Sequence, residues 1–553
     1  MYVVLSLDPA GVTFTQLDSS GVPTGEPRSV RDVTAEVARI EREQAESGRP
    51  GGVRWVWDDT SRWYPRLLRA GVRVERCVDL RLSHAILRSS ELTAASALAR
   101  GPRTAWDGPT PEQRAQSVGL FDLDEPADVE EPVTEFLAQR DAIAQSGHTA
   151  RLGLLLAAES AGALVAAEMK QVGLPWSRDV HLRLLDQLLG PRPREGERPE
   201  RMRETLDLVR RALEAPDLNP DSPQELVRAL GRAGIQTTST RSWDLQTIDN
   251  PAITPLLDYK KQARLLSANG WNWLDTNVPD RRFHPDYVPG GVVTGRWASK
   301  GGGGALQLPK QVRGAVIADP GWSLVVADAA QLEPRILSAL AGDRAMAEAG
   351  RAGDLYEGIV ASGAVDTRAH AKVAMLGAMY GATSGEAGRL MPRLARAYPR
   401  AIALVEEAAR AGERGEVVST RLGRSSPRGE VPGFDETATD ADASRTRTRA
   451  RSWGRFTRNF VVQGTAAEWA LCWMAGLRRR LHDLSGGVEL AASAHLVFFL
   501  HDELVVHCPS GQAGAVSDAV RAAAADAGRL LFGDLPVEFP VTVAVVADYG
   551  SAK

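Results

Sequence analysis

Two apolar runs separated by three polar residues constrain the fold of this chain more than any other feature. Residues 498–500 and 504–506 flank the tripeptide His501-Asp502-Glu503, which is too short for anything except a tight hairpin turn. The apolar runs would anchor the hairpin in a core, so the turn presents Asp502 and Glu503 to solvent or to a metal ion. An ordinary solvated turn is the alternative, although tight hairpins usually prefer Gly or Asn at this place.

A second carboxylate stands at the end of another apolar run. Residues 322–327 read Trp-Ser-Leu-Val-Val-Ala, a pattern typical of a strand, and Asp328 follows directly. A carboxylate at a strand end is rigidly placed and can bind a divalent cation. The alternative is an Asp that caps the next helix, which would hold Gln331, Glu333 and Arg335.

Two further segments carry polar side chains at every fourth position of a predicted helix. The first stripe contains Arg368, Lys372, Leu376 and Tyr380, and the second contains Arg455, Asn459 and Gln463. Residues four apart share a helix face. Two cations, an apolar contact and a ring suit a nucleoside triphosphate laid along the first helix. Amide and guanidinium groups on the second can meet base edges and phosphates. Solvated amphipathic helices remain the alternative for both.

The wider pattern predicts a multi-domain protein. Residues 1–120 alternate short apolar runs with helical stretches, which indicates an α/β domain, and residues 134–280 and 345–480 are mostly helical. The net charge of −4 averages over surfaces and does not exclude a nucleic-acid partner. We expect no membrane span, no secretory signal and neither a disulfide framework nor a zinc cluster from Cys77, Cys472 and Cys508.

In this order, the motifs resemble those of the family A DNA polymerases, the bacterial DNA polymerase I group. Asp328-x-x-Gln331-x-Glu333-x-Arg335 is similar to motif A, Arg368-x3-Lys372-x7-Tyr380-Gly381 to motif B, and His501-Asp502-Glu503 to motif C. Thr294-Gly295-Arg296, with Leu306-Gln307 and Arg313 downstream, resembles the segment that joins thumb and palm. Residues 258–267 resemble a thumb helix. The resemblance covers roughly residues 155–553.

The resemblance implies an α+β protein with the right-hand polymerase fold of palm, fingers and thumb, preceded by an α/β RNase H-like domain of the exonuclease type. We expect the exonuclease-like domain at 1–150, the helical thumb region at 151–285, the palm at 286–345 and 453–553, and the fingers at 346–452. No 5′-nuclease domain is expected. The expected partners are primer–template DNA and dNTPs. We expect the protein to be a monomer and to lie in the cytoplasm, at the nucleoid.

The resemblance also implies roles for single residues. Asp328 and Asp502, helped by the backbone carbonyl of Ala329, would bind two Mg²⁺ ions, with Mn²⁺ as a substitute and Glu503 nearby. Arg368 and Lys372 would bind the triphosphate, and Lys372 could protonate the leaving pyrophosphate. Gln331, Glu333, Leu376 and Tyr380 would line the nucleotide site, where Glu333 excludes a 2′-hydroxyl. The residues expected to hold the primer terminus and the duplex are Arg296, Arg313, Arg455, Asn459, Gln463 and His501.

The sequence departs from the family pattern at several positions. Ala329, Ala330 and Pro334 replace the common residues of motif A, and Tyr356 replaces a usual histidine. Leu376 stands where the family normally has Phe or Tyr, so we expect altered sugar selectivity.

The N-terminal domain departs further from the exonuclease pattern. Its first strand carries Asp8 without the expected glutamate, Asp79 matches part of a second motif, and an expected Asp near Trp63 is missing. We therefore expect a degenerate, inactive exonuclease-like domain. A polymerase with a working exonuclease, or a non-catalytic DNA-binding scaffold, remains the alternative.

Overall fold

The computed structural model describes residues 1–8, 11–47, 52–108, 131–237, 239–246, 248–300, 308–351, 353–382, 385–430 and 440–552. The chain forms two compact units. The first contains Met1–Val172, Tyr287–Ser299 and Val325–Ala544, and the second contains Gly173–Asp286, Lys300–Leu324 and Val545–Lys553. The helix that ends at Val172 packs within the first unit.

A five-stranded sheet forms the N-terminal part of the first unit. Its strand order is β3-β2-β1-β4-β5, and β1, β4 and β5 run parallel. The elements are β1 (Tyr2–Asp8), β2 (Gly11–Leu17), β3 (Arg28–Val30), α1 (Val33–Ser47), β4 (Arg54–Trp57), α2 (Thr60–Arg69), β5 (Cys77–Asp79), α3 (Leu80–Ser89), α4 (Ala97–Arg100) and α6 (Pro132–Gln145). The α/β pattern predicted for residues 1–120 is therefore confirmed for their described part.

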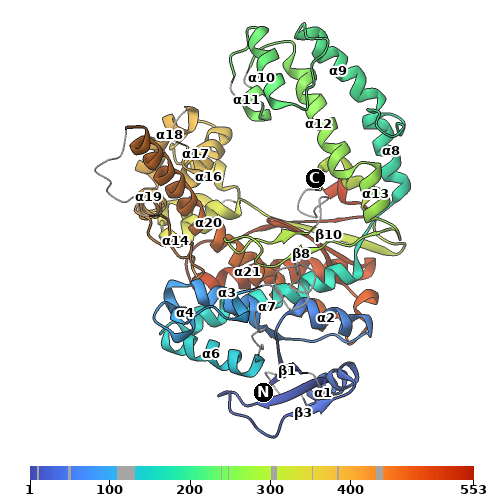
Figure 1. The fold of residues 1–553 in the computed structure, drawn as a ribbon, viewed down its shortest axis with the longest axis vertical. Helices are drawn as coiled ribbons and strands as arrows, with labels where there is room; N and C mark the ends of the chain where they lie inside the picture. Colours follow the sequence, from blue (N-terminus) through green and yellow to red (C-terminus); the bar gives the residue numbers. More distant parts are fainter. Residues whose placement is uncertain are drawn as a thin grey trace, which may run out of the picture. The chain divides into compact units, whose positions relative to one another are not determined.

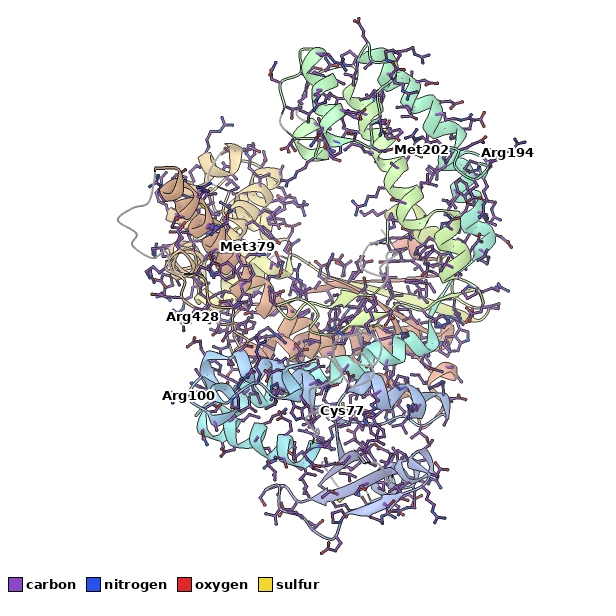
Figure 2. All side chains as sticks on the ribbon, viewed as in Figure 1. Cys77, Arg100, Arg194, Met202, Met379 and Arg428 are labelled. Carbon is purple, nitrogen blue, oxygen red and sulfur yellow. The ribbon has the colours of Figure 1, made fainter. Side chains whose placement is uncertain are left out.

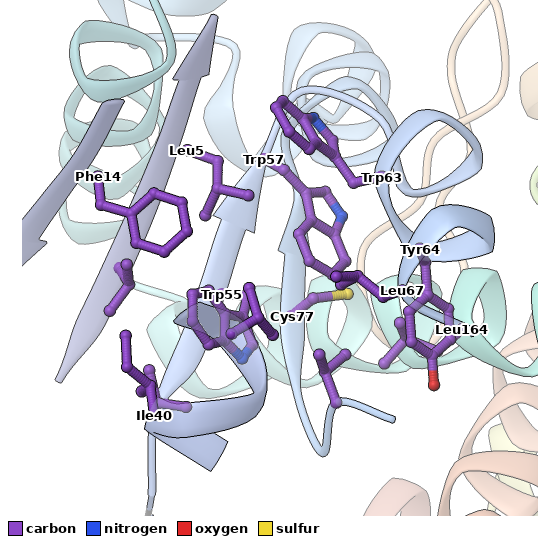
Figure 3. Close-up of a cluster of buried hydrophobic side chains, with 14 of the residues drawn as sticks. Leu5, Phe14, Ile40, Trp55, Trp57, Trp63, Tyr64, Leu67, Cys77 and Leu164 are labelled. Carbon is purple, nitrogen blue, oxygen red and sulfur yellow. The ribbon is translucent and has the colours of Figure 1, made fainter. Parts of the chain in front are cut away.

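Large aromatic side chains fill the core on one face of this sheet. Figure 3 shows Trp55 and Trp57 of β4 beside Tyr64 of α2 and Cys77 of β5, with Leu164 of helix α7 (Thr149–Val172) next to them. All five are buried, and burial of such apolar area is the main force that holds a fold together. The N-terminal sheet and α7 thus share one core.

Helix α7 is the one helix of the described residues that is long and apolar enough to cross a membrane. Its best window has a mean hydropathy of 1.5, but 72% of that window is buried inside the protein. It packs against α2, α3 and β5 and also against α20 (Asp440–Ser485) and β11 (His495–Leu500) (Figure 1). Because a core helix passes the same test, its composition is explained by this packing.

A second sheet has the strand order β11-β12-β10-β13. The further strands are β10 (Trp322–Ala329), β12 (Glu503–Pro509) and β13 (Val541–Val546), and α21 (Ala513–Phe532) packs on β12. β11 and β12 form an antiparallel hairpin in which Leu500 pairs with Glu503. The predicted hairpin and the predicted strand from residue 322 are both confirmed.

The remaining described segments are mostly helical, as predicted. In the first unit they are α14 (Leu332–Ala341), α15 (Arg344–Gly350), α16 (Leu355–Ala361), α17 (Arg368–Tyr380), α18 (Gly385–Ala397) and α19 (Pro399–Glu413). In the second unit they are α8 (Arg178–Leu189), α9 (Glu200–Ala212), α10 (Pro223–Arg232), α11 (Ser242–Gln246), α12 (Ile253–Asn269) and α13 (Trp271–Asn277). The second unit has its own apolar core, which includes Val209, Leu230 and Leu256.

Candidate active site

The strand ends that carry Asp328 and Asp502 are bonded to each other. β10 and β12 are neighbours in the sheet, and the N–H of Ala329 donates to the carbonyl oxygen of Asp502 at 2.9 Å. Residues 324–327 are at most 3% exposed, whereas Asp328 and Asp502 are partly exposed. The buried strands therefore fix both aspartates at one edge of the sheet, where solvent reaches them.

The hairpin turn is shorter than predicted. Glu503 is the first residue of β12 and is only 3% exposed, so it is not presented to solvent as we expected. The turn consists of His501 and Asp502, and His501 has a positive φ of 59°. A two-residue hairpin turn requires such a left-handed residue. The strand pairing thus withdraws Glu503 from the turn and leaves Asp502 there.

The oxygen atoms at this edge fit a hard divalent cation. Carboxylates and backbone carbonyls are the ligands that Mg²⁺ prefers, and Mg²⁺ usually takes one or two carboxylates and completes its shell with water and substrate phosphates. Asp328, Asp502 and the carbonyl of Ala329 supply this kind of donor set. Within the described ranges, no group of three or more His, Cys, Asp or Glu residues forms a closed metal site.

Gln331 and Arg335 hold the backbone around motif A. Gln331 adopts a left-handed conformation, with φ 48°, at the start of α14, and its side-chain oxygen accepts a hydrogen bond from Leu355 N–H at 3.3 Å. Arg335 is 2% exposed and donates to carbonyl oxygens, among them Ala330 at 2.9 Å and Glu538 at 3.0 Å. Gln331 was predicted in the nucleotide site, but its side chain bonds internally to Leu355 and Arg335.

Glu333 receives hydrogen bonds from two distant segments. The Arg296 guanidinium forms an ion pair with one of its oxygens, and the Tyr380 hydroxyl donates to the other at 2.9 Å. Burial, followed by the charge of Glu333, raises the pKa of Tyr380 to about 12, and Gln463 also bonds to this hydroxyl. Partial desolvation and the charge of Arg296 lower the pKa of His501. These interactions bring together predicted residues from five parts of the chain.

The predicted stripe on α17 is confirmed as an exposed face. Thr367 caps the helix by accepting from His370 N–H at 3.1 Å. The four stripe residues are exposed, whereas Ala371, Ala374 and Met375 on the other side are buried. Figure 2 labels Met379, which lies on the same buried side. The two cations and Tyr380 are therefore available to a ligand from one direction.

Asp354 holds Arg368 at the start of this helix. One carboxylate oxygen of Asp354 accepts from Arg368 Nε at 3.0 Å and from Nη2 at 2.8 Å. The guanidinium also lies over the Tyr356 ring, 5.5 Å from its centroid. Lys372 is exposed, and the structure gives it no ion pair with any described residue. The Arg368 side chain is thus held in position by the carboxylate of Asp354, while the Lys372 side chain is exposed to solvent.

Helix α20 carries the second stripe and is bonded to α17 and α19. Arg455 is exposed, and Asn459 and Gln463 are partly exposed. Arg458, one residue before Asn459, donates to the carbonyl of Ala378 at 2.9 Å and pairs with Glu406 at 2.8 Å, which ties α20 to α17 and α19. The stripe is therefore attached to the helix that carries Arg368 and Lys372.

Comparison with known proteins identifies the family. The model of DNA polymerase family A matches residues 197–551, which is more than half of the chain. The chain belongs to DNA polymerase family A. Its relatives include thermostable DNA polymerase I of Thermus filiformis, which is 28% identical over 354 residues and matched over 58% of this chain and 39% of its own length. DNA polymerase I of Chloroflexus aurantiacus is 26% identical over 327 residues, with 53% and 32% covered.

This family A chain spans about two fifths of the length of the Thermus relatives. Among solved structures, the fold is similar to the POL domain of Pol1 from M. smegmatis in complex with DNA primer-template and dNTP. The match covers 100% of this chain and 95% of that one, with a TM-score of 0.64 and 20% sequence identity. The expected fold class, α+β with the architecture of a family A polymerase, is therefore confirmed.

In the N-terminal domain of this family A chain, Asp79 stabilises the local structure. It ends β5, is buried, and accepts hydrogen bonds from the backbone N–H groups of Thr60 at 2.8 Å and Leu82 at 3.0 Å. Burial, followed by the charge of Asp59, raises its pKa to about 7. Asp79 is therefore the N-cap of α3. The side chain of Asp8, the other predicted ligand, lies outside the described residues.

The Asp that the exonuclease motif would place near Trp63 is absent from the sequence, but the carboxylate of Asp58 lies beside the Trp63 ring. Asp58, at the end of β4, accepts from the ring N–H of Trp63 and from Arg62 Nη1 at 2.8 Å. Asp58 stands five positions before Trp63 in the chain. The sequence signal that could have pointed to it is a strand followed directly by acidic residues. Its bonds are internal, like those of Asp79.

Arg313 is assigned to a different compact unit from the other predicted residues. It belongs to the second unit, is 8% exposed and lies 4.4 Å from the centroid of the Tyr549 ring. Leu306 and Gln307, which shared its motif, lie outside the described residues. Asp354 and Arg335 were given no role from sequence, because their bonds join positions that are distant in the chain.

Proposed function

We propose that this chain is a template-directed DNA polymerase that adds deoxynucleotides from dNTPs to a primer 3′-hydroxyl and releases pyrophosphate. The observation that carries the proposal is the bonded pair of strand ends with Asp328 and Asp502, in the same unit as the exposed cationic face of α17. The primer-template and dNTP in the related Pol1 complex support the same substrates.

Asp328, Asp502 and the Ala329 carbonyl would hold two Mg²⁺ ions, which Mn²⁺ could replace. When bound, the ions would stabilise negative charge on the attacking 3′-oxygen and on the leaving pyrophosphate. The buried Glu503 supports the turn that positions Asp502.

Arg368 and Lys372 would bind the triphosphate. Arg368 exchanges Asp354 for phosphate oxygens, and Lys372 donates a proton to the leaving pyrophosphate. A lysine suits this step because its pKa can be tuned, whereas arginine stays charged. Glu333, held by Arg296 and Tyr380, would lie under the sugar and exclude a 2′-hydroxyl.

The DNA would be held mainly by side chains of the first unit. Arg296, Arg455, Asn459, Gln463 and His501 would contact the primer terminus and the minor groove, because guanidinium and amide groups serve both phosphates and base edges. Arg313 is included among these DNA-binding residues only because its sequence segment resembles the family's segment between thumb and palm. We further propose a monomer that fills gaps in repair or replication at the nucleoid, in the cytoplasm.

The N-terminal domain would have no exonuclease activity. Asp58 and Asp79 use their oxygens in bonds to backbone and side-chain donors of the same domain. A carboxylate that caps a helix and is buried is poorly placed to bind a metal ion in solvent. The domain would therefore contribute structure.

Primer extension tests the proposal. The wild type should extend a primed template with dNTPs and Mg²⁺, and Asp328→Ala should abolish extension while it still binds the duplex in an anisotropy assay. Asp518→Ala, an exposed change on α21, is the matched control and should extend normally. A lane without dNTPs should show no shortening of the primer. Binding without extension by the wild type would favour a non-catalytic scaffold, and shortening that needs Mg²⁺ would indicate a working exonuclease.

A further inference from the structure

A cavity of about 600 Å³ lies within the first unit. It is bordered by the β4–β5 side of the N-terminal sheet, by α7, by the C-terminal half of α20 and by α21. Its lining contains none of the residues assigned above to the polymerase site. Its volume falls in the range of about 300–1,000 Å³ that is typical of sites for small organic molecules.

The floor of this cavity is one apolar face of α7. Leu154, Ala157, Ala158 and Ala161 recur at the spacing of a single helix face. Cys472 of α20 and Cys77 of β5, the latter labelled in Figure 2, continue the apolar surface. Burial raises the pKa of both thiols, so they contribute as neutral groups. Because these alanine side chains are small, they leave space beside this part of α7, whereas the rest of the helix is packed in the core.

The lining carries more positive than negative charge. Its arginines are Arg54, Arg76, Arg478, Arg479, Arg480 and Arg529, and its acidic residues are Glu75, Asp483 and Asp526. Asp526 pairs with both Arg480 and Arg529, and Glu168, outside the cavity, pairs with Arg478. The Nε atom of Arg76 is buried, lies 3.9 Å from Glu75 Oε1 and has no hydrogen-bond partner among the described residues. A polar donor in that position is suited to an anion.

We propose that this cavity binds a small amphipathic organic anion. The apolar body of the ligand would lie on the α7 floor, and its carboxylate, phosphate or sulfonate would face Arg76 and Arg479. Apolar burial supplies the non-directional part of such binding, and guanidinium groups bind anionic oxygens through charge-assisted hydrogen bonds. The site is independent of the polymerase proposal, because no residue is shared.

Fluorescence titration of the full chain tests the site with two matched probes. The first is 1-anilinonaphthalene-8-sulfonate, and the second is N-phenyl-1-naphthylamine, which has the same ring system without the sulfonate. The wild type should bind one sulfonate probe per chain. Ala161→Phe, which fills the floor, should abolish binding of both probes. The double change Arg76→Ala and Arg479→Ala should weaken the sulfonate probe about tenfold and leave the neutral probe within about twofold.

The controls separate the site from general apolar surface. The double change Arg66→Ala and Arg521→Ala removes two exposed arginines outside the cavity and should leave both affinities unchanged. Near-ultraviolet circular dichroism checks that each variant is folded. The proposal is overturned if the wild type binds no sulfonate probe, if folded Ala161→Phe binds it as well as the wild type does, or if the Arg76/Arg479 variant loses both probes equally.

Discussion

A buried ion-pair network joins the N-terminal domain to α20, and its removal should destabilise the first unit strongly. Arg478 donates to Glu168 from Nη2 at 2.7 Å and to the carbonyls of Val74 and Glu75 at 2.6 and 2.8 Å. Arg73 and the Tyr64 hydroxyl donate to the same carboxylate at 2.9 and 2.6 Å. The side chains of Arg478 and Glu168 are only 7% and 6% exposed. Solvent therefore cannot replace a lost partner.

The pKa of Glu168 gives the direction of the effect, and the cost of breaking a buried ion pair gives its magnitude. Burial alone would raise the pKa of Glu168, but the charges of Arg478 and then Arg73 lower it from 4.5 to about 2. A shift of that size corresponds to about 3 kcal/mol of stability, present above pH 4.5 and lost as the pH falls toward 2. Breaking a buried ion pair by removing one partner costs about 3–5 kcal/mol. Arg478→Met should therefore cost about 3–5 kcal/mol at pH 7.

A double-mutant cycle by urea unfolding measures this cost. The tryptophans of the N-terminal core, such as Trp57 beside Tyr64, supply the fluorescence signal. The pair Glu168→Gln and Arg478→Met leaves no uncompensated carboxylate, so it should cost about 2–3 kcal/mol less than the sum of the single changes. The matched exposed change Arg521→Met should stay within about 0.5 kcal/mol. The reasoning would be refuted if the two single changes were strictly additive in the free energy of unfolding, or if Arg478→Met lowered that free energy by less than about 1 kcal/mol.

Three further outcomes are expected. Leu376→Phe adds a planar ring at an exposed position of α17 and should change selection among deoxy-, dideoxy- and ribonucleotides about tenfold in competitive incorporation. Incorporation ratios equal to those of the wild type would contradict this prediction. Glu333→Ala removes the acceptor of Tyr380 and should raise ribonucleotide incorporation at least about tenfold in single-turnover assays. Burial raises the pKa of Glu468 to about 7, so the folded state binds the extra proton and stability should fall by about 3 kcal/mol between pH 4.5 and 7. Glu468→Gln should flatten that pH dependence of the urea midpoint, and an unchanged slope would count against it.

The local elements of this protein could be predicted from the sequence because their signals are local. The run before Asp328 forms a strand, and the four-residue repeat from Arg368 forms one exposed helix face, as the spacing indicated. Glu503 was misplaced because a period of two residues does not say where a strand begins, and pairing with Leu500 decides it. The bond from Ala329 to Asp502 joins residues far apart in the chain and has no local signature.

The contacts of Glu333 suggest how such non-local bonds serve selectivity. A carboxylate that excludes a 2′-hydroxyl must stay in place, and one free to rotate would move aside. Arg296 holds one oxygen of Glu333 and Tyr380 holds the other, so the side chain is fixed from two segments at once. Leu376, one turn before Tyr380 on α17, has no polar atom that could share this task. The sugar selection proposed for this chain therefore depends on Arg296 as much as on Glu333, although its motif suggested only DNA binding.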